Sequence, residues 1–183
     1  MAGLVIIVGP IASGKSTVAN GVETELRESG EAVAVVDLDD VVEMIGGFDG
    51  LTPERFRQAQ LVCGQLVSAW LRQQTDVIAH GPFLQRNKVL ALEHALPGGT
   101  SIARVHLLAT FEVAAERLAA DPARKLSADL GFLRATYDCV AALRPLTGQS
   151  DWTFDTTTMP SSLIINELTA ALIGQWRIRA RER

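Results

Sequence analysis

The sequence predicts an α/β fold with three layers, in which a five-stranded parallel sheet lies between two layers of helices. Short apolar runs rich in valine and isoleucine alternate with longer stretches whose apolar residues recur at helical spacing, a pattern typical of a parallel sheet covered on both faces. The first apolar run leads through a glycine-bounded turn directly into a helical stretch. The chain has 183 residues, of which 48% are hydrophobic and 21% charged, and this predicts one folded domain over residues 1–183.

The expected elements alternate along the chain. Strands are predicted at residues 4–8, 32–36, 76–80, 102–108 and 152–154. Helices are predicted at residues 15–29, 41–45, 53–73, 83–95, 110–120, 128–143 and 161–176. Thr52 followed by Pro53 indicates a helix start, and Thr110 can cap the helix after the fourth strand. Asp40 is the candidate cap of the short helix 41–45.

Composition and charge argue against several classes of protein. The formal net charge is −4, which disfavours a nucleic-acid partner or an anionic membrane surface. Cys63 and Cys139 lie far apart without C-x-x-C spacing, so neither a zinc site nor a disulfide framework is expected. No apolar run approaches the length of a membrane span, and no basic region precedes the first strand as in a signal peptide. We therefore expect a cytoplasmic protein without nucleic-acid or membrane partners.

The turn after the first strand carries the strongest motif, Gly9-Pro10-Ile11-Ala12-Ser13-Gly14-Lys15-Ser16. This is the pattern G-x-x-x-x-G-K-S between a strand and a helix, and it predicts a site for a nucleoside triphosphate. Glycines let successive N–H groups turn inward around an anion, and the positive end of the following helix adds attraction for phosphate. Lys15 can reach the terminal phosphates, and the Ser16 hydroxyl can bind Mg²⁺. The predicted nucleotide-binding residues of this segment are Gly9, Ile11, Ala12, Ser13, Gly14, Lys15, Ser16 and Thr17. The alternative is a glycine-rich turn that merely precedes a helix.

A second group of candidate residues follows the second and third strands. In parallel sheets the ligand lies beyond the carboxyl ends of the strands, so we expect Asp37, Asp39, His80 and Gly81 on the same rim as the loop. Asp37 and Asp39 are separated by one residue on a segment expected to be extended, which turns both side chains to the same side. One carboxylate can then hold Mg²⁺ while the other accepts a proton from an attacking hydroxyl. The alternative is a solvated acidic turn that caps the next helix.

These residues together resemble shikimate kinase and its relatives, the small P-loop kinases of the nucleoside-monophosphate-kinase type. The family's D-x-D followed by an acid is matched by Asp37-Leu38-Asp39 and Glu43, and its F-R pair by Phe56-Arg57. The resemblance implies that Asp37 organises Mg²⁺ and that Asp39 binds the acceptor hydroxyl as the candidate base. It also implies that Arg57 binds the substrate.

The same resemblance covers the second half of the chain. The family's paired lid arginines are matched by Arg117, expected against adenine, and Arg124, expected to act in catalysis from a mobile lid at about residues 118–128. Its later substrate-binding arginine is matched by Arg144 in Arg144-Pro145-Leu146. Its final strand and exit, near the adenine, are matched at Asp155-Thr156.

The sequence departs from shikimate kinase after the third strand. The family's triple glycine is replaced by His80-Gly81-Pro82-Phe83, where Pro82 has no N–H to donate. We expect His80 and Gly81 to face the substrate, although a buried structural histidine is an equal alternative. These changes are similar to those of the chloramphenicol phosphotransferases.

The predicted function is that of an ATP-dependent kinase of small molecules, with ATP and Mg²⁺ as cofactors. It would transfer the γ-phosphoryl group to a hydroxyl of a metabolite or an antibiotic, with Lys15, Asp39 and Arg124 in the catalytic roles. The predicted state is a monomer or a small homo-oligomer. Two alternatives stay open, a regulatory ATP-binding module without phosphoryl transfer and a nucleotide kinase.

Overall fold

The computed structural model of the chain describes residues 2–81, 92–120, 130–142 and 150–181, and structural statements below concern these residues. The greater part of the helix expected at 83–95 and of the lid expected at 118–128 lies outside them. Two predicted site residues, Arg124 and Arg144, lie outside them as well.

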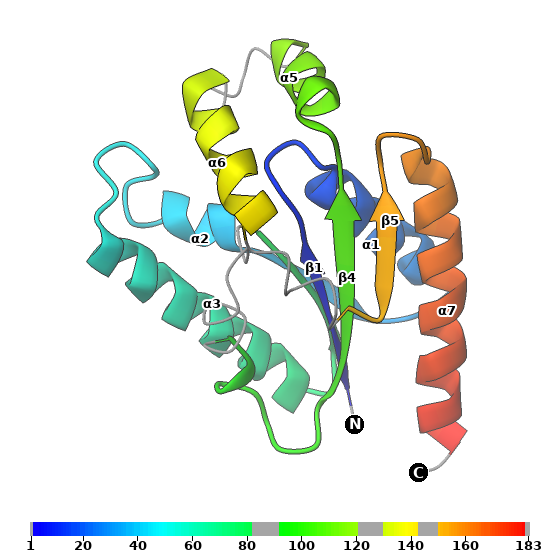
Figure 1. The fold of residues 1–183 in the computed structure, drawn as a ribbon. Helices are drawn as coiled ribbons and strands as arrows, with labels where there is room; N and C mark the ends of the chain where they lie inside the picture. Colours follow the sequence, from blue (N-terminus) through cyan, green and yellow to red (C-terminus); the bar gives the residue numbers. More distant parts are fainter. Residues whose placement is uncertain (1, 82–91, 121–129, 143–149, 182–183) are drawn as a thin grey trace.

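The predicted five-stranded parallel sheet is confirmed. Neighbouring strands are all parallel and follow the order β2-β3-β1-β4-β5. The first strand along the chain therefore lies at the centre of the sheet (Figure 1). The strands are β1 (Gly3–Val8), β2 (Val33–Asp37), β3 (Asp76–His80), β4 (Ser101–Leu108) and β5 (Trp152–Asp155).

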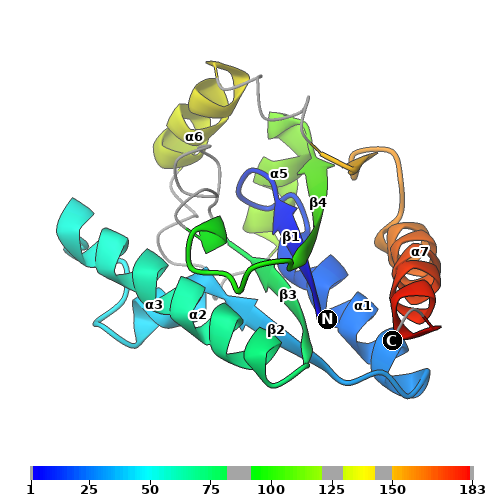
Figure 2. The ribbon, with the colours of Figure 1, turned by 90° about the horizontal axis from the view of Figure 1, so that it is seen from below.

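Helices cover both faces of the sheet, which confirms the three layers. The helices are α1 (Lys15–Glu28), α2 (Leu38–Glu43), α3 (Pro53–Arg72), α5 (Phe111–Ala119), α6 (Leu130–Ala142) and α7 (Ser161–Arg181). Viewed along the strands, α1 and α7 lie on one face and α3 on the other (Figure 2). Helices α5 and α6 lie beyond the carboxyl ends of the strands, on the side where the loop after β1 turns (Figure 1).

Side chains along the strands point alternately to the two faces of the sheet, which divides the core into two halves. Leu4 and Ile6 of β1 pack with α3, whereas Val5 and Ile7 pack with α1 and α7. All four side chains are at least 99% buried, because every side chain of a central parallel strand faces a helical layer. The continuous apolar run that opens the sequence is thus explained by burial on both faces.

One sequence expectation about the second strand is wrong. The segment after Asp37 is not extended, because α2 begins at Leu38 and Asp39 lies in its first turn. Asp37, not Asp40, is the cap: its Oδ1 accepts a hydrogen bond from the Asp39 backbone N–H at 2.9 Å. A carboxylate at the end of a strand satisfies an otherwise unpaired helix N–H, and this starts the helix three residues earlier than expected.

A third, smaller cluster joins the loop after β1 to the helices beyond the sheet. Ala114 and Leu118 of α5 and Leu133 of α6 are buried together, with Ile11 and Ala12 of the loop packed against them. The loop is therefore held from outside as well as by its own strand and helix. In the described part of the chain, no helix combines the length and apolarity needed to cross a membrane.

Candidate active site

The glycine-bounded loop joins the central strand to a helix whose first turn is left without a side-chain cap. Gly14 is the N-cap of α1, in the left-handed conformation (φ 91°, ψ 14°) that glycine adopts without strain. As a glycine, Gly14 offers no side chain to cap the helix, and the first turn holds no acidic residue. The first N–H groups of a helix need an acceptor, and phosphate oxygens suit this positive end.

The loop is packed closely against the end of β4. A Cβ atom on Gly9 would lie 2.5 Å from the Leu107 carbonyl oxygen and 2.6 Å from Ser13 Oγ, so only glycine fits there. Ser13 is fully buried, and its Oγ has no hydrogen-bond partner among the described residues. Lys15 Nζ donates to the carbonyl oxygens of Gly9 at 3.0 Å and Pro10 at 2.8 Å. The ammonium group is thus held over the start of the loop.

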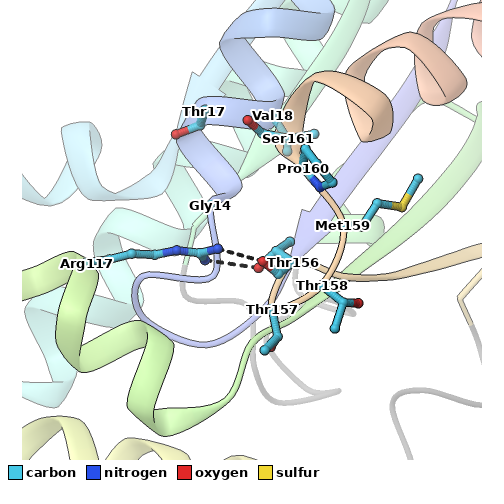
Figure 3. A pocket seen from close by; sticks show the side chains of 10 residues that line it. All are labelled: Gly14, Thr17, Val18, Arg117, Thr156, Thr157, Thr158, Met159, Pro160 and Ser161. Atoms are coloured by element: carbon cyan, nitrogen blue, oxygen red, sulfur yellow. Dashed lines mark hydrogen bonds between the residues drawn. The ribbon is translucent and has the colours of Figure 1, made fainter.

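A cavity of about 340 Å³ opens beside the start of α1 (Figure 3). Its lining comes from α1, from Arg117 of α5, and from the segment between β5 and α7. The lining residues are Gly14, Thr17, Val18, Arg117, Thr156, Thr157, Thr158, Met159, Pro160 and Ser161. The volume lies within the usual range of small-molecule sites. The structure therefore places Thr17 and Arg117, both predicted for nucleotide binding, at one cavity beside the loop.

Arg117 connects the cavity wall to the loop. Its guanidinium donates to Thr156 Oγ1 at 3.0 Å, to the Thr156 carbonyl at 2.6 Å and to the Ala12 carbonyl at 2.9 Å (Figure 3). Asp155 is exposed and is not a lining residue; its Oδ1 accepts the Thr157 N–H at 2.8 Å. Asp155 thus shapes the segment that lines the cavity.

The acidic side of the site joins the ends of β2 and β3. Asp37 and His80 are paired in the sheet register, and Asp37 Oδ1 lies 3.5 Å from His80 Nδ1. Burial and the nearby charge of Lys15 lower the pKa of His80 to about 4. His80 is therefore neutral at pH 7, and its contact with Asp37 is not an ion pair.

Asp39 has an environment suited to a base. Burial first, and then the charge of Asp37, raise its pKa to about 6, while Lys15 and His80 act in the opposite direction. The carboxylate is thus within electrostatic reach of Lys15, Asp37 and His80. A carboxylate with a pKa near neutrality can be charged at pH 7 and still accept a proton.

The residues predicted to bind the substrate lie in different environments. Gly81 is buried against α2, and a Cβ atom on it would lie 2.7 Å from Leu38 Cβ. His80 is only 2% exposed. Arg57 is exposed on α3. The structure brings Asp37, Asp39, His80 and Lys15 together, and the substrate contacts of Arg57, His80 and Gly81 stay predictions.

The residues of the loop and of β2 fit a nucleotide with Mg²⁺. An uncapped helix end next to a lysine suits the phosphates, and the cavity beside it suits the nucleoside. Mg²⁺ takes one or two carboxylates together with phosphate oxygens, and the predicted ligands, the Ser16 hydroxyl and the Asp37 carboxylate, are oxygen donors of this kind.

Two parts of the site were not predicted from the sequence. The resemblance implied that Asp155-Thr156 lies near the adenine, but the rest of the cavity wall, residues 157–161, was not predicted; the run of three threonines after the last strand was the available signal. Tyr137 of α6 donates its hydroxyl to the Ile11 carbonyl at 3.1 Å. Nothing in the sequence near Tyr137 indicates this contact, because the two residues are 126 positions apart.

Comparisons with known proteins agree with this fold. A family model described as an AAA domain matches residues 4–132. A sugar kinase from Janibacter sp. has a similar structure, with a TM-score of 0.67 and 21% identity over 94% of this chain and 95% of that chain. No match to the sequence was found among the curated proteins.

Two further solved structures share the fold. Shikimate kinase from Acinetobacter baumannii, in complex with shikimate, has a TM-score of 0.65 and 17% identity over 96% of this chain and 95% of that chain. A tunicamycin resistance protein from Deinococcus radiodurans has a TM-score of 0.68 and 19% identity over 95% of this chain and 96% of that chain. The chain thus has the α/β fold of the small P-loop kinases, as its resemblance to shikimate kinase implied.

Proposed function

The chain belongs to the AAA-domain family, and from its P-loop kinase fold and its site we propose that it is an ATP-dependent kinase of small molecules. The acceptor is a hydroxyl group of a metabolite or of an antibiotic. This proposal is supported by kinases of small molecules among the structures with the same fold. It also agrees with the position of an acidic pair beside the phosphate-binding loop.

The observation that carries the proposal is the environment of Asp39. A module that only binds ATP needs the loop and the cavity, but it needs no carboxylate whose pKa is raised toward neutrality. Asp39 has a pKa of about 6 and interacts with Lys15, which belongs to the phosphate-binding loop. This interaction supports Asp39 as the proposed base, since Lys15 is the residue expected to hold the transferred phosphoryl group.

The proposed reaction needs few protein groups because phosphoryl transfer depends mostly on positioning and on charge stabilisation. The acceptor oxygen forms a bond with the γ-phosphorus, and the bond from that phosphorus to the β–γ bridging oxygen breaks. The bonding electrons leave with ADP, and the acceptor proton passes to the carboxylate of Asp39. Lys15 and the loop N–H groups hold the phosphates.

Mg²⁺ bound by Ser16 and Asp37 would neutralise charge on the β- and γ-phosphates. Arg124 is proposed to approach the transferred group. The arginine side chains of Arg57 and Arg144 are proposed to bind an anionic part of the acceptor, since a guanidinium pairs with a carboxylate through two hydrogen bonds. His80 and Gly81 complete the proposed acceptor side.

The test is an ADP-release assay with ATP and Mg²⁺ and a panel of hydroxyl-bearing acceptors. The panel includes shikimate, simple sugars, tunicamycin and chloramphenicol, and mass spectrometry identifies a phosphate monoester of the acceptor. With the acceptor found, Asp39→Asn is expected to lower kcat by about 10²- to 10⁴-fold, the usual contribution of a positioned acid or base. Asp40→Asn is the matched control, since Asp40 is the exposed neighbour on α2.

Two outcomes would contradict the proposal. If the protein binds ATP but no acceptor raises ADP release above slow hydrolysis, the alternative of a regulatory ATP-binding module is favoured. If Asp39→Asn and Asp40→Asn have the same activity as the wild type, Asp39 is not the base.

A further inference from the structure

The backbone of the phosphate-binding loop is held by side chains from three helices and from the segment after β5. Five successive carbonyl oxygens, from Gly9 to Ser13, each lie within hydrogen-bond distance of a side-chain donor. The donors are Lys15 for Gly9 and Pro10, Tyr137 for Ile11, Arg117 for Ala12, and Thr156 for Ser13, at distances of 2.8 to 3.1 Å. The single hydroxyl proton of Thr156 is shared with the Leu108 carbonyl, which lies 2.9 Å from Thr156 Oγ1. Three of these donors come from positions more than 100 residues away in the sequence.

Holding a carbonyl in place also sets the direction of the next N–H group. The peptide unit is planar and the loop has no cis peptide bond, so the N–H of residue i+1 points away from the carbonyl of residue i. The Ile11 carbonyl faces the hydroxyl of Tyr137. The N–H of Ala12 therefore faces the opposite side of the loop backbone, away from α6.

Ala12 is the residue whose conformation most needs this support. Its φ is 58°, in the left-handed region, which is unfavourable for a residue with a Cβ atom. Rotating the peptide unit between Ile11 and Ala12 by about half a turn would bring φ of Ala12 back to a favoured negative value. The same rotation would turn the Ala12 N–H toward α6, away from the side on which we expect the phosphates. The hydrogen bond from Tyr137 to the Ile11 carbonyl opposes this rotation.

Tyr137 is itself well fixed. Its ring packs edge to face on Phe111 of α5, with centroids 5.9 Å apart and planes at 83°, and belongs to the cluster that holds Ile11 and Ala12. Burial raises the pKa of Tyr137 to about 12, so its hydroxyl remains protonated, and able to donate, at neutral pH. Unlike Arg117, Tyr137 does not line the nucleoside cavity.

We propose that Tyr137 is a positioning residue for the phosphates, which acts by fixing the peptide unit between Ile11 and Ala12. This inference rests on the proposed function, since it concerns the same nucleotide site. Tyr137 is not among the described residues that line the cavity, so its effect is expected to be confined to ligands that carry phosphate. Arg117, in contrast, acts on both the loop and the cavity wall.

The test compares Tyr137→Phe with the wild type by isothermal titration with adenosine, ADP and a non-hydrolysable ATP analogue, with Mg²⁺ present. The variant keeps the ring packed on Phe111 and removes one hydrogen bond, so the affinity for ADP and for the analogue is expected to fall about three- to tenfold. The affinity for adenosine is expected to stay unchanged. Thr136→Val is the matched control: it removes the hydroxyl of the neighbouring residue, which donates to the Phe132 carbonyl within α6 at 2.9 Å, and is expected to bind all three ligands like the wild type.

A double-mutant cycle tests the mechanism. Glycine adopts the left-handed conformation without strain, so in an Ala12→Gly background the loss caused by Tyr137→Phe is expected to shrink. The inference is overturned if Tyr137→Phe binds ADP like the wild type, or if adenosine affinity falls by the same factor as ADP affinity. A wild type that binds ADP normally but phosphorylates no acceptor contradicts the proposed kinase function and leaves this binding test intact. A wild type that binds no ADP contradicts both.

Discussion

The first turn of α1 differs from the first turns of α2, α3 and α5. Those three helices begin with a side-chain cap, from Asp37, Thr52 and Thr110 respectively, and each has an acidic residue in its first turn. Helix α1 begins at Gly14 with neither. A cap and an acid both satisfy the positive end of a helix. Because α1 has neither, its positive end, next to Lys15 and the glycine-bounded loop, can interact with the negative charge of a phosphate ligand.

Among changes at the helix starts, the largest effect is expected from removing the positive charge of Lys15 beside the uncapped start of α1. Lys15→Ala is expected to leave the cavity wall in place, because Lys15 is not one of its lining residues, although the substitution also removes the hydrogen bonds to the Gly9 and Pro10 carbonyls. The loss of one preorganised donor to the phosphates is expected to lower kcat by about 10²- to 10³-fold. Steady-state kinetics measure this, and titration with adenosine is the control. Unchanged turnover would remove the basis for the phosphate site.

A more direct test of this difference is to introduce an acidic residue into the first turn of α1, as in α2, α3 and α5. Thr17→Glu places a carboxylate in the first turn of α1, beside the cavity. It is expected to raise the melting temperature of the nucleotide-free protein slightly, since an acid at a helix start is favourable. The affinity for ADP is expected to fall about tenfold through repulsion. Thr17→Gln is the control, because glutamine has the size of glutamate but no charge. Equal ADP affinity in the two variants would contradict the prediction.

Removing the cap of another helix is expected to change the stability of the protein but not its affinity for ADP. Thr52 Oγ1 accepts the Arg55 N–H at the start of α3, away from the phosphate-binding loop. Thr52→Ala is expected to lower the free energy of unfolding by about 1 kcal/mol, while ADP affinity stays the same. Urea denaturation and titration measure the two quantities, and Thr52→Ser, which keeps the hydroxyl, is the control. Weaker ADP binding in Thr52→Ala would show that this cap also serves the site.

The smallest effect concerns pH and the acidic side of the site. The pKa of His80 falls to about 4 in the folded protein, so the unfolded chain binds more protons between pH 4 and 6.5, and this group makes stability rise with pH. The pKa of Asp39 rises to about 6, so the folded chain binds more protons between pH 4 and 6, and this group makes stability fall with pH. In the nucleotide-free wild type the two effects oppose each other.

Substituting either His80 or Asp39 is expected to leave only the other residue's effect on the pH dependence of stability. Relative to the wild type, Asp39→Asn is expected to gain stability between pH 4.5 and 6.5, and His80→Gln to lose it. Urea denaturation at the two pH values, without nucleotide, measures both differences. Parallel pH profiles in all three proteins would show that neither pKa is shifted as described.

Much of the fold could be predicted from the sequence because its signals are local. The apolar strand, the glycines and the Lys15-Ser16 pair all lie within residues 3–16, and Thr52 and Thr110 indicated helix starts that the structure confirms. The start of α2 was predicted less accurately. Asp37, Asp39 and Asp40 are all possible N-caps, and only the structure shows that the Asp37 carboxylate accepts the hydrogen bond from the Asp39 N–H.

What the sequence by itself determined is the central strand, the phosphate-binding loop and the helix after it, since near neighbours in the chain decide these conformations. The tertiary structure decided which distant side chains hold that loop. Arg117 and Tyr137 reach Ala12 and Ile11 only because α5 and α6 pack together beyond the carboxyl ends of the strands. Contacts across more than 100 positions depend on how whole helices pack, and no local pattern of residues encodes that arrangement.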